Sequence, residues 1–139
     1  MTLTVSSLDL ADARRVIAAG ERKAIEIGVA SSIAVVDAGG HLVAHARMDG
    51  AWIGSIDISI DKAWTARATE YATDELAAFS QSGGPLFGLN TTNNARVVIF
   101  GGGVPIRRGG HVIGAVGASG GSVDQDVSVA RAAAAGFGD

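Results

Sequence analysis

The chain has 139 residues, the size of one ordinary domain, and 47% of them are hydrophobic while only 18% are charged. Its formal net charge is -3 and it has no basic run, which disfavours nucleic acid as a partner because a phosphate backbone needs clustered positive charge. Cysteine is absent, which excludes disulfides, thiol nucleophiles and cysteine-ligated metals.

No secretory leader or membrane-spanning run is apparent in the sequence. Residues 1–15 lack a basic start followed by an apolar segment, and no uncharged apolar run has the length of a bilayer span. We therefore expect a cytoplasmic protein with no membrane partner, formed as a single domain by residues 1–139. The small share of charged residues also predicts that apolar surface is buried between the subunits of a homo-oligomer.

The first element is a predicted helix. Apolar residues recur at intervals of three, four and seven over residues 10–27, as one face of a helix requires. Ser6 with Asp9 resembles a capping box that would start this helix, and Gly28 is a typical C-terminal stop.

A hairpin is predicted next, with strands at residues 31–37 and 41–47 joined by a glycine turn at 38–40. Strand residues alternate between the two faces of a sheet. One face of the return strand should therefore carry His41, Val43, His45 and Arg47.

Residues 54–80 contain no Pro or Gly after Gly54 and are predicted to be helical, with a break near 71–73 where Thr73 would cap a second piece. Small polar and charged side chains share one stripe of this helix, namely Ser55, Ser59, Lys62, Thr65 and Thr69. The stripe fits either the wall of a pocket or a solvated face. Residues 81–96 then form a long loop, of the kind that often serves as a lid or a subunit contact.

Three short apolar runs rich in Val and Ile follow, at residues 97–100, 104–108 and 111–118, and each is predicted to be a strand. Gly109 and Gly110 favour a two-residue turn with positive φ, so the strands on either side should pair antiparallel. Ser122 and Gln125 form a capping box that opens a final helix.

The segment Gly117 to Gly121 matches the G-x-S-x-G pattern around a nucleophilic serine. All three histidines precede Ser119, whereas in the hydrolases that use this pattern the histidine follows the serine. Tight packing of helix on strand, or an anion site formed by backbone amides, is the favoured interpretation.

His41 and His45 suggest a metal-binding pair, because H-x-x-x-H on a helix places two imidazoles one turn apart. On a strand they lie about 13 Å apart, too far to share one ion. His45 alone remains a candidate ligand of a haem iron, against the alternative of a surface or interfacial histidine. No phosphate-binding motif is present, so nucleotide binding is not favoured.

Two basic residues are candidates for binding a carboxylate. Arg47 has the two-pronged geometry that this requires, although a surface pair with Asp49 fits equally well. Lys62 lies among small residues, as a partly buried ammonium that binds propionate would, or as a lysine that reaches solvent.

Six motifs in this order resemble the recurrent patterns of the GlcG/HbpS-like family, the haem-binding or haem-degrading HbpS-like domain, to which the C-terminal domain of PduO-type proteins is related. They lie at residues 35–40 (VVDAGG), 47–51 (RMDGA), 62–66 (KAWTA), 102–106 (GGVPI), 113–120 (IGAVGASG) and 125–126 (QD).

The resemblance covers nearly the whole chain and implies an α+β fold. A central antiparallel five-stranded sheet would be flanked by helices, as in profilin-like or PAS-like sandwiches, and assembled into oligomers. The elements derived above agree with it in the order α-β-β-α-α-β-β-β-α. The family is associated with haem binding and, in some members, with haem breakdown or redox sensing.

The resemblance therefore implies a protein that binds haem, or a similar flat small molecule with carboxylates, between the 47–51 turn, the helix of Lys62 and the 102–106 loop. The expected cofactor-binding residues are Arg47, Met48, Asp49, Lys62, Thr65, Gly102, Gly103 and Pro105. His45 is the expected ligand of the haem iron, with Met48 as the second choice.

The alternative is an enzyme or accessory protein of small-acid or aromatic catabolism. Arg47 and Lys62 would anchor a carboxylate substrate, and Asp49 or Asp126 would act as acid or base. Such a site needs at least one carboxylate with a shifted pKa inside a cleft. A third alternative is a structural or interaction module without a ligand.

Overall fold

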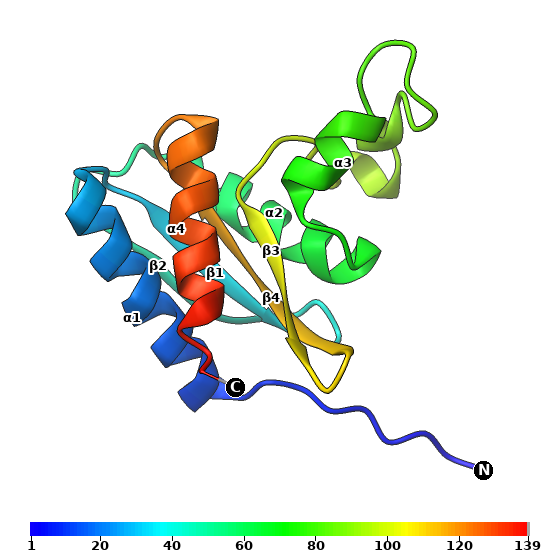
Figure 1. Cartoon of the computed structure of the whole chain (residues 1–139), viewed down its shortest axis with the longest axis horizontal. Coiled ribbons are helices and arrows are strands. Elements are labelled where there is room, and N and C mark those ends of the chain that lie inside the picture. Colours follow the sequence, from blue (N-terminus) through cyan, green and yellow to red (C-terminus); the bar gives the residue numbers. More distant parts are fainter. Residues whose placement is uncertain (139) are drawn as a thin grey trace.

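The computed structural model describes residues 1–138 and shows one antiparallel sheet between two layers of helix (Figure 1). Its elements are α1 (Leu10–Ile27), β1 (Ser32–Asp37), β2 (Leu42–Arg47), α2 (Ser55–Thr69), α3 (Thr73–Phe79), the 3-10 turns η1 (Leu89–Thr91) and η2 (Asn93–Ala95), β3 (Gly103–Arg108), β4 (His111–Ser119) and α4 (Val123–Ala135). Among these residues no helix is long and apolar enough to cross a bilayer.

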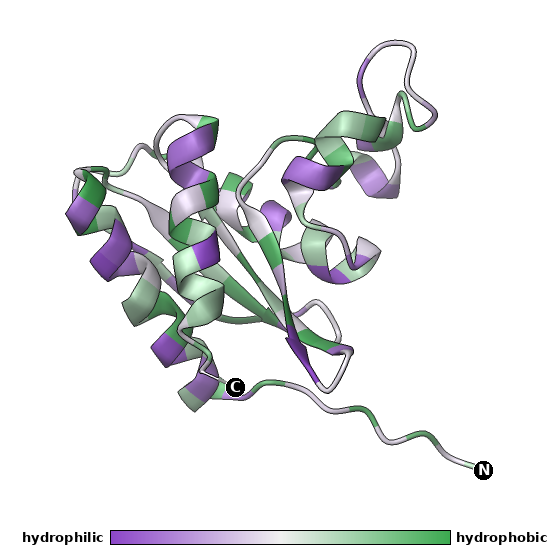
Figure 2. Ribbon diagram, viewed as in Figure 1, coloured by the Kyte–Doolittle hydropathy of each residue, from purple (hydrophilic) through white to green (hydrophobic). Residues whose placement is uncertain are grey.

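The strands lie in the order β2-β1-β4-β3, and every neighbouring pair is antiparallel. Helices α1 and α4 pack side by side on one face, while α2 covers mainly β4 and β1 on the other (Figure 1). Hydrophilic residues lie along the outer sides of α1 and α4 (Figure 2). The predicted α+β class and the antiparallel sheet flanked by helices are thus confirmed.

The prediction of a fifth strand at residues 97–100 is wrong, and with it the order that placed three strands after α3. This segment pairs with no strand. Its backbone is instead held by Thr65 of α2, whose hydroxyl accepts a hydrogen bond from Val98 N at 3.0 Å and lies 3.4 Å from Arg96 O. A side chain of the neighbouring helix takes the place of a strand partner, which an apolar run does not reveal.

The predicted helix and turn signals are mostly confirmed. Gly28 ends α1 with φ 73°, Ser122 and Gln125 cap α4, and Gly109 and Gly110 form the β3–β4 turn with φ 57° and 81°. The start of α1 differs, because Asp9 rather than Ser6 is its N-cap and pairs reciprocally with Asp12.

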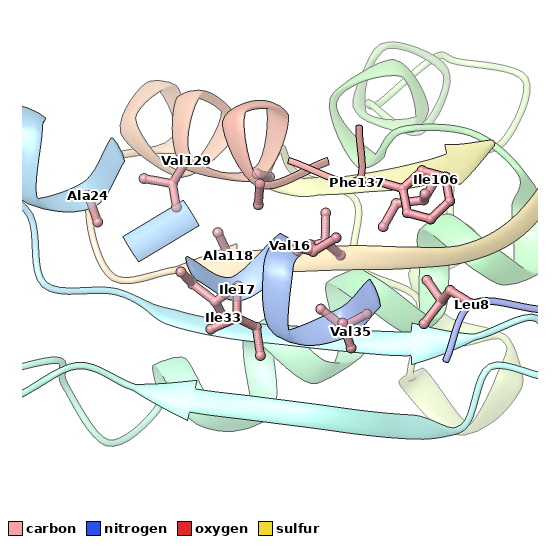
Figure 3. Close-up of a cluster of buried hydrophobic side chains, with 14 of the residues drawn as sticks. Leu8, Val16, Ile17, Ala24, Ile33, Val35, Ile106, Ala118, Val129 and Phe137 are labelled. Carbon is pink, nitrogen blue, oxygen red and sulfur yellow. The ribbon is translucent and has the colours of Figure 1, made fainter. Parts of the chain in front are cut away.

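A cluster of large aliphatic side chains fills the space between the sheet and α1 and α4 (Figure 3). Ile33 and Val35 of β1 meet Val16 of α1 and Val129 of α4 there, all of them fully buried. The number and size of these side chains make this face the main hydrophobic contribution to stability.

The face under α2 is built from small residues. Ala34 and Ala115 of the sheet meet Ala63 of α2, all without exposed surface. A Cβ at Gly117 would lie 2.6 Å from the backbone N of Ala63 and closer still to Ser59 O. The bare glycine therefore lets the backbone of α2 rest directly on β4.

A bulge in β2 overturns the alternation predicted for this strand. Val36 pairs with Leu42 and Val35 with Ala44, so Val43 is left without a partner and packs with the aliphatic cluster. Leu42 consequently shares the α2 face with His45 and Arg47, whereas the prediction placed Val43 there.

Candidate functional site

A buried ion pair joins α2 to α4. The ammonium Nζ of Lys62 lies 3.0 Å from Asp126 Oδ2 and donates a second hydrogen bond to Ala118 O at 2.9 Å. Lys62 has no exposed surface and Asp126 only 4%. Burial lowers the pKa of Lys62, and the adjacent carboxylate of Asp126 acts in the opposite direction.

The glycine loop before β3 closes over this lysine. Gly102 has φ 125°, and a Cβ on it would lie 2.6 Å from Lys62 Nζ. Gly103 packs against the backbone of Lys62 and donates its N–H to Thr73 Oγ1 at 2.9 Å. The ring of Phe100 lies 5.2 Å from Nζ. A ligand carboxylate would therefore have to displace Asp126 to reach this ammonium.

The polar stripe of α2 is neither a solvated face nor the wall of an open pocket. Ser55, Ser59, Lys62 and Thr65 are completely buried against the sheet. Ser55 Oγ lies 2.9 Å from Ser32 Oγ, and Thr65 holds the segment before the glycine loop. Each polar group is thus used inside the fold, as buried polar groups generally are.

His45 lies on β2 and contacts the polar stripe of α2 at Ser59. It is half-buried on β2, with Nε2 3.3 Å from Ser59 Oγ, and burial lowers its pKa, which favours the neutral imidazole. The Ser59 hydroxyl donates its hydrogen to Ile56 O at 2.8 Å, so it accepts from His45 Nε2–H. Within residues 1–138 the other ring nitrogen, Nδ1, has no hydrogen-bond partner.

Three of the predicted binding residues lie at the end of β2 and in the turn after it, but they do not share one environment. Arg47 is exposed and donates from Nε to Ala51 O at 3.0 Å. Met48 points into the aliphatic cluster, with its sulfur 3.5 Å from Ser31 N. Asp49 is exposed, so the structure separates the two carboxylates of the enzyme alternative, Asp49 in solvent and Asp126 in the interior.

The predicted site residues thus form two groups. One row of paired residues crosses the sheet from Gly103 on β3, through Gly117 and Ala34, to His45 on β2. Gly103 and His45 thus lie at opposite ends of the row. Three strand spacings separate these ends by about 14 Å. Lys62, Thr65, Gly102 and Gly103 lie at the β3 side, and Pro105 follows on that edge strand. His45 and Arg47 lie at the β2 side.

The G-x-S-x-G segment does not form an open serine site. Ser119 is 2% exposed at the end of β4, and the amide of Gly121 donates to Asp126 Oδ1 at 2.9 Å. The chain's own carboxylate therefore occupies the anion position that these amides could offer. In the part of the chain that is described, no cluster of three or more His, Asp or Glu residues could hold a metal ion.

A further cluster on the outer side of α2 was not predicted. Asp61, Trp64 and Arg96 line an open cavity of about 350 Å³ together with Asn93, Asn94 and Ala95, the last three with left-handed φ. The Arg96 guanidinium lies 4.5 Å from the Trp64 ring centre and 3.6 Å from Asp61. Burial raises the pKa of Asp61. The spacing of Asp61 and Trp64 on one helix face was the available signal.

Comparison with known proteins gives a family match over almost the whole chain. The model of the family described as "Haem degrading protein HbpS-like" matches residues 8–135. A Citrobacter freundii protein, described as an uncharacterized 15.0 kDa protein in the dhaT-dhaS intergenic region, is 46% identical over 129 residues. That similarity covers 93% of this chain and 91% of the relative.

Two solved structures are similar throughout. The Klebsiella pneumoniae protein ORFY superposes with a TM-score of 0.95 at 45% identity, over 98% of this chain and 94% of that one. The structure described as the PduOC:haem complex has a TM-score of 0.89 at 38% identity, over 95% of each chain.

Proposed function

The chain belongs to the haem-degrading HbpS-like family, and on that premise we propose that it binds haem. The observation that carries the proposal is the similarity to the PduOC:haem complex, at 38% identity over 95% of both chains. Haem, when bound, would supply an iron centre for ligand binding or electron transfer.

We place the iron ligand at His45. A neutral imidazole is the form that ligates iron, and the burial of His45 favours that form. Nδ1 has no partner among the described residues, and Ser59 holds the ring through Nε2. A hydrogen bond of this kind fixes the orientation of a ligating histidine.

The surroundings of His45 fit a flat ligand with carboxylates. Arg47 lies two residues further along the same strand face, and within residues 1–138 its terminal nitrogens have no partner. These nitrogens can bind a propionate in a two-pronged fashion. Leu42 at the start of the strand and Trp52 in the segment after it have about half of their surface exposed, which provides apolar contact for a macrocycle.

The buried group has a different role in this proposal. The polar atoms of this group are already bonded within the fold, and its glycines pack against Lys62. The group, namely Lys62, Thr65, Gly102 and Gly103, therefore holds α2 and the glycine loop against the sheet. Ser59 lies on the same helix, so the position of α2 fixes the imidazole of His45. Of the remaining predicted residues, Met48 packs in the aliphatic cluster and Asp49 adds an exposed negative charge beside the proposed site. Pro105 lies on β3, at the opposite edge of the sheet.

Titration of the purified protein with haemin tests the proposal. We expect a shifted Soret band that saturates at one haem per chain, and an altered band in His45→Ala. His41→Ala is the matched control and should leave the spectrum unchanged, because the His41 side chain is 83% exposed and lies immediately before the same strand. Absence of a Soret shift in the wild type would refute haem binding, and identical spectra for wild type and His45→Ala would refute the ligand.

A further inference from the structure

The first seven residues form an arm that leaves the body of the molecule (Figure 1). They have no helix or strand assignment, and all seven are exposed. Apolar Met1, Leu3 and Val5 alternate with Thr2, Thr4 and Ser6, a period of two that is typical of a strand with one buried face (Figure 2). Leu3 is 89% exposed and Val5 68%, so the chain itself does not supply that burial.

The root of the arm is fixed to the sheet. Leu8 is buried and donates its N–H to Ile113 O at 3.0 Å, and Ser7 Oγ accepts from Ala38 N at 3.0 Å. Beyond this anchor a cavity of about 370 Å³ separates residues 4–6 from the β3–β4 turn and the end of α2. The arm therefore starts from a defined place but does not pack on its own subunit.

One edge of the sheet is closed to an added strand. On β3 the N–H of Gly103 donates to Thr73 Oγ1, and Pro105 has no N–H to offer. Arg107 and Arg108 follow, and the guanidinium of Arg107 donates to Glu70 O. Proline, charged side chains and capped amides are the features by which proteins protect edge strands.

Within residues 1–138 the opposite edge strand, β2, has no proline and no outward amide capped by a side chain, and Arg47 at its end and the bulge at Val43 are the features of this kind that it carries. Met48 N donates inward to Ser31 O, and in an antiparallel ladder the inward amides alternate. The amides of Ala46 and Ala44 therefore face β1, whereas those of His45 and Arg47 face outward. β2 forms the lower margin of the sheet in Figure 3, and its sequence LVAHAR contains no proline or lysine.

We propose that residues 2–6 of one copy add to the outer edge of β2 in a second copy, so that each sheet gains a fifth strand from its partner. Leu3 and Val5 would cover the half-buried margin of the aliphatic cluster formed by Val43, Ala44 and Ala46. Thr2 and Thr4 would lie on the other face of the added strand. Exchange of the arm between two copies satisfies both unpaired edges at once, as a two-fold interface requires.

The mass in solution and the exchange of β2 amides test this arrangement together. We expect the wild type to be a dimer or a multiple of it, and Leu3→Asp/Val5→Asp to lower the mass at least twofold in light scattering. Thr2→Asp/Thr4→Asp carries the same added charge on the other face of the arm and is the matched control. It should retain the wild-type mass.

Residue-resolved hydrogen exchange then locates the contact. In Leu3→Asp/Val5→Asp the amides of His45 and Arg47 should exchange at least tenfold faster, while those of Ala44 and Ala46, bonded to β1, keep their rates. A monomeric wild type overturns the proposal. So does a mass unaffected by Leu3→Asp/Val5→Asp, or unchanged exchange at His45 and Arg47. All of these measurements use protein without haem and are independent of the proposed function.

Discussion

The two faces of the sheet are held by different kinds of contact. Under α1 and α4, Ile33 and Val35 belong to a cluster of large aliphatic side chains. Under α2 lies a layer of glycine, alanine and serine, and a buried ion pair of Lys62 with Asp126 joins this helix to α4. Aliphatic packing tolerates changes of similar volume, whereas a buried charge requires one specific partner. The first face therefore gives stability, and the second fixes the position of α2 and, through Ser59, of His45.

The largest expected effect comes from Asp126→Asn, which removes the charge that compensates Lys62 in the interior. Breaking a buried pair at one partner costs about 3–5 kcal/mol, because the other charge stays buried and uncompensated. Urea denaturation should show this loss in the free energy of unfolding.

The matched variant is Lys62→Met/Asp126→Leu, which replaces both charges by apolar groups. We expect it to recover most of the loss, because apolar replacement of a whole buried pair is often close to neutral. A double variant as unstable as Asp126→Asn would show that packing around these side chains, not charge, decides the stability of this face.

The next effect concerns the close approach of α2 to β4. Gly117→Ala places a methyl group against the backbone of Ser59 and Ala63, which cannot move without displacing the helix, and should cost about 2–3 kcal/mol. Gly20→Ala is the counterpart on the aliphatic face, where the methyl group meets the end of the Ile33 side chain at 2.8 Å and Ala133 Cβ at 3.0 Å.

In Gly20→Ala the Ile33 side chain can rotate away, and alanine is favoured over glycine within a helix by about 1 kcal/mol. We therefore expect a net change within about 1 kcal/mol. Equal losses in Gly20→Ala and Gly117→Ala, measured by thermal or urea unfolding, would contradict the difference between the faces.

The same difference decides what the sequence could predict. Periodicity, caps and glycine turns located α1, both hairpins and α4, because these signals act within a few residues. The buried pair joins residues 64 positions apart, so Lys62 and Asp126 were each recognised as candidates but not as partners. The false strand at residues 97–100 has the same origin, because Thr65 captures that segment from another element.

The candidate site was predicted in part for the same reason. His45 and Arg47 share a strand face, which two-residue spacing indicates directly. The bulge at Val43 was not predicted, because nothing in the sequence LVAHAR marks the extra residue. The cavity at Trp64 and Arg96 depends on how residues 93–96 fold back on α2, a contact between distant segments.

Smaller losses of stability are expected at two serines of the polar stripe of α2, Ser59 beside the half-buried His45 and Ser55 beside the buried Ser32. Ser59→Ala removes the acceptor of His45 Nε2–H, but this ring is half-buried and can turn to water, so we expect a loss of about 1 kcal/mol. Ser55→Ala leaves Ser32 Oγ fully buried without its partner and should cost about 1–3 kcal/mol.

The two serine variants also differ in their expected haem spectra. Ser59→Ala should shift the Soret band of the haem-loaded protein, because the ring of His45 is no longer held, whereas Ser55→Ala should leave it in place. A shift in Ser55→Ala as large as in Ser59→Ala would mean that the hydrogen bond to Ser59 does not orient His45, the proposed iron ligand.

The smallest expected effect is a slope in stability with pH. Burial lowers the pKa of Lys62 in the folded protein below its value in the unfolded chain. Between these two pKa values the unfolded chain binds more protons, so this lysine makes the free energy of unfolding rise with pH. At lower pH the lysine is charged in both states and the full cost of burying the charge is present. The window therefore extends downward from the ordinary pKa of lysine.

Urea denaturation between pH 7 and pH 10, with Lys62→Met/Asp126→Leu as reference, isolates this contribution. The wild type should gain stability relative to the reference as the pH rises. Asp126→Asn should begin to gain at a lower pH, because it lacks the carboxylate that raises the pKa of Lys62. If the three curves run parallel, Lys62 keeps its ordinary pKa in the folded protein, and the face under α2 stabilises a charge as well as water does.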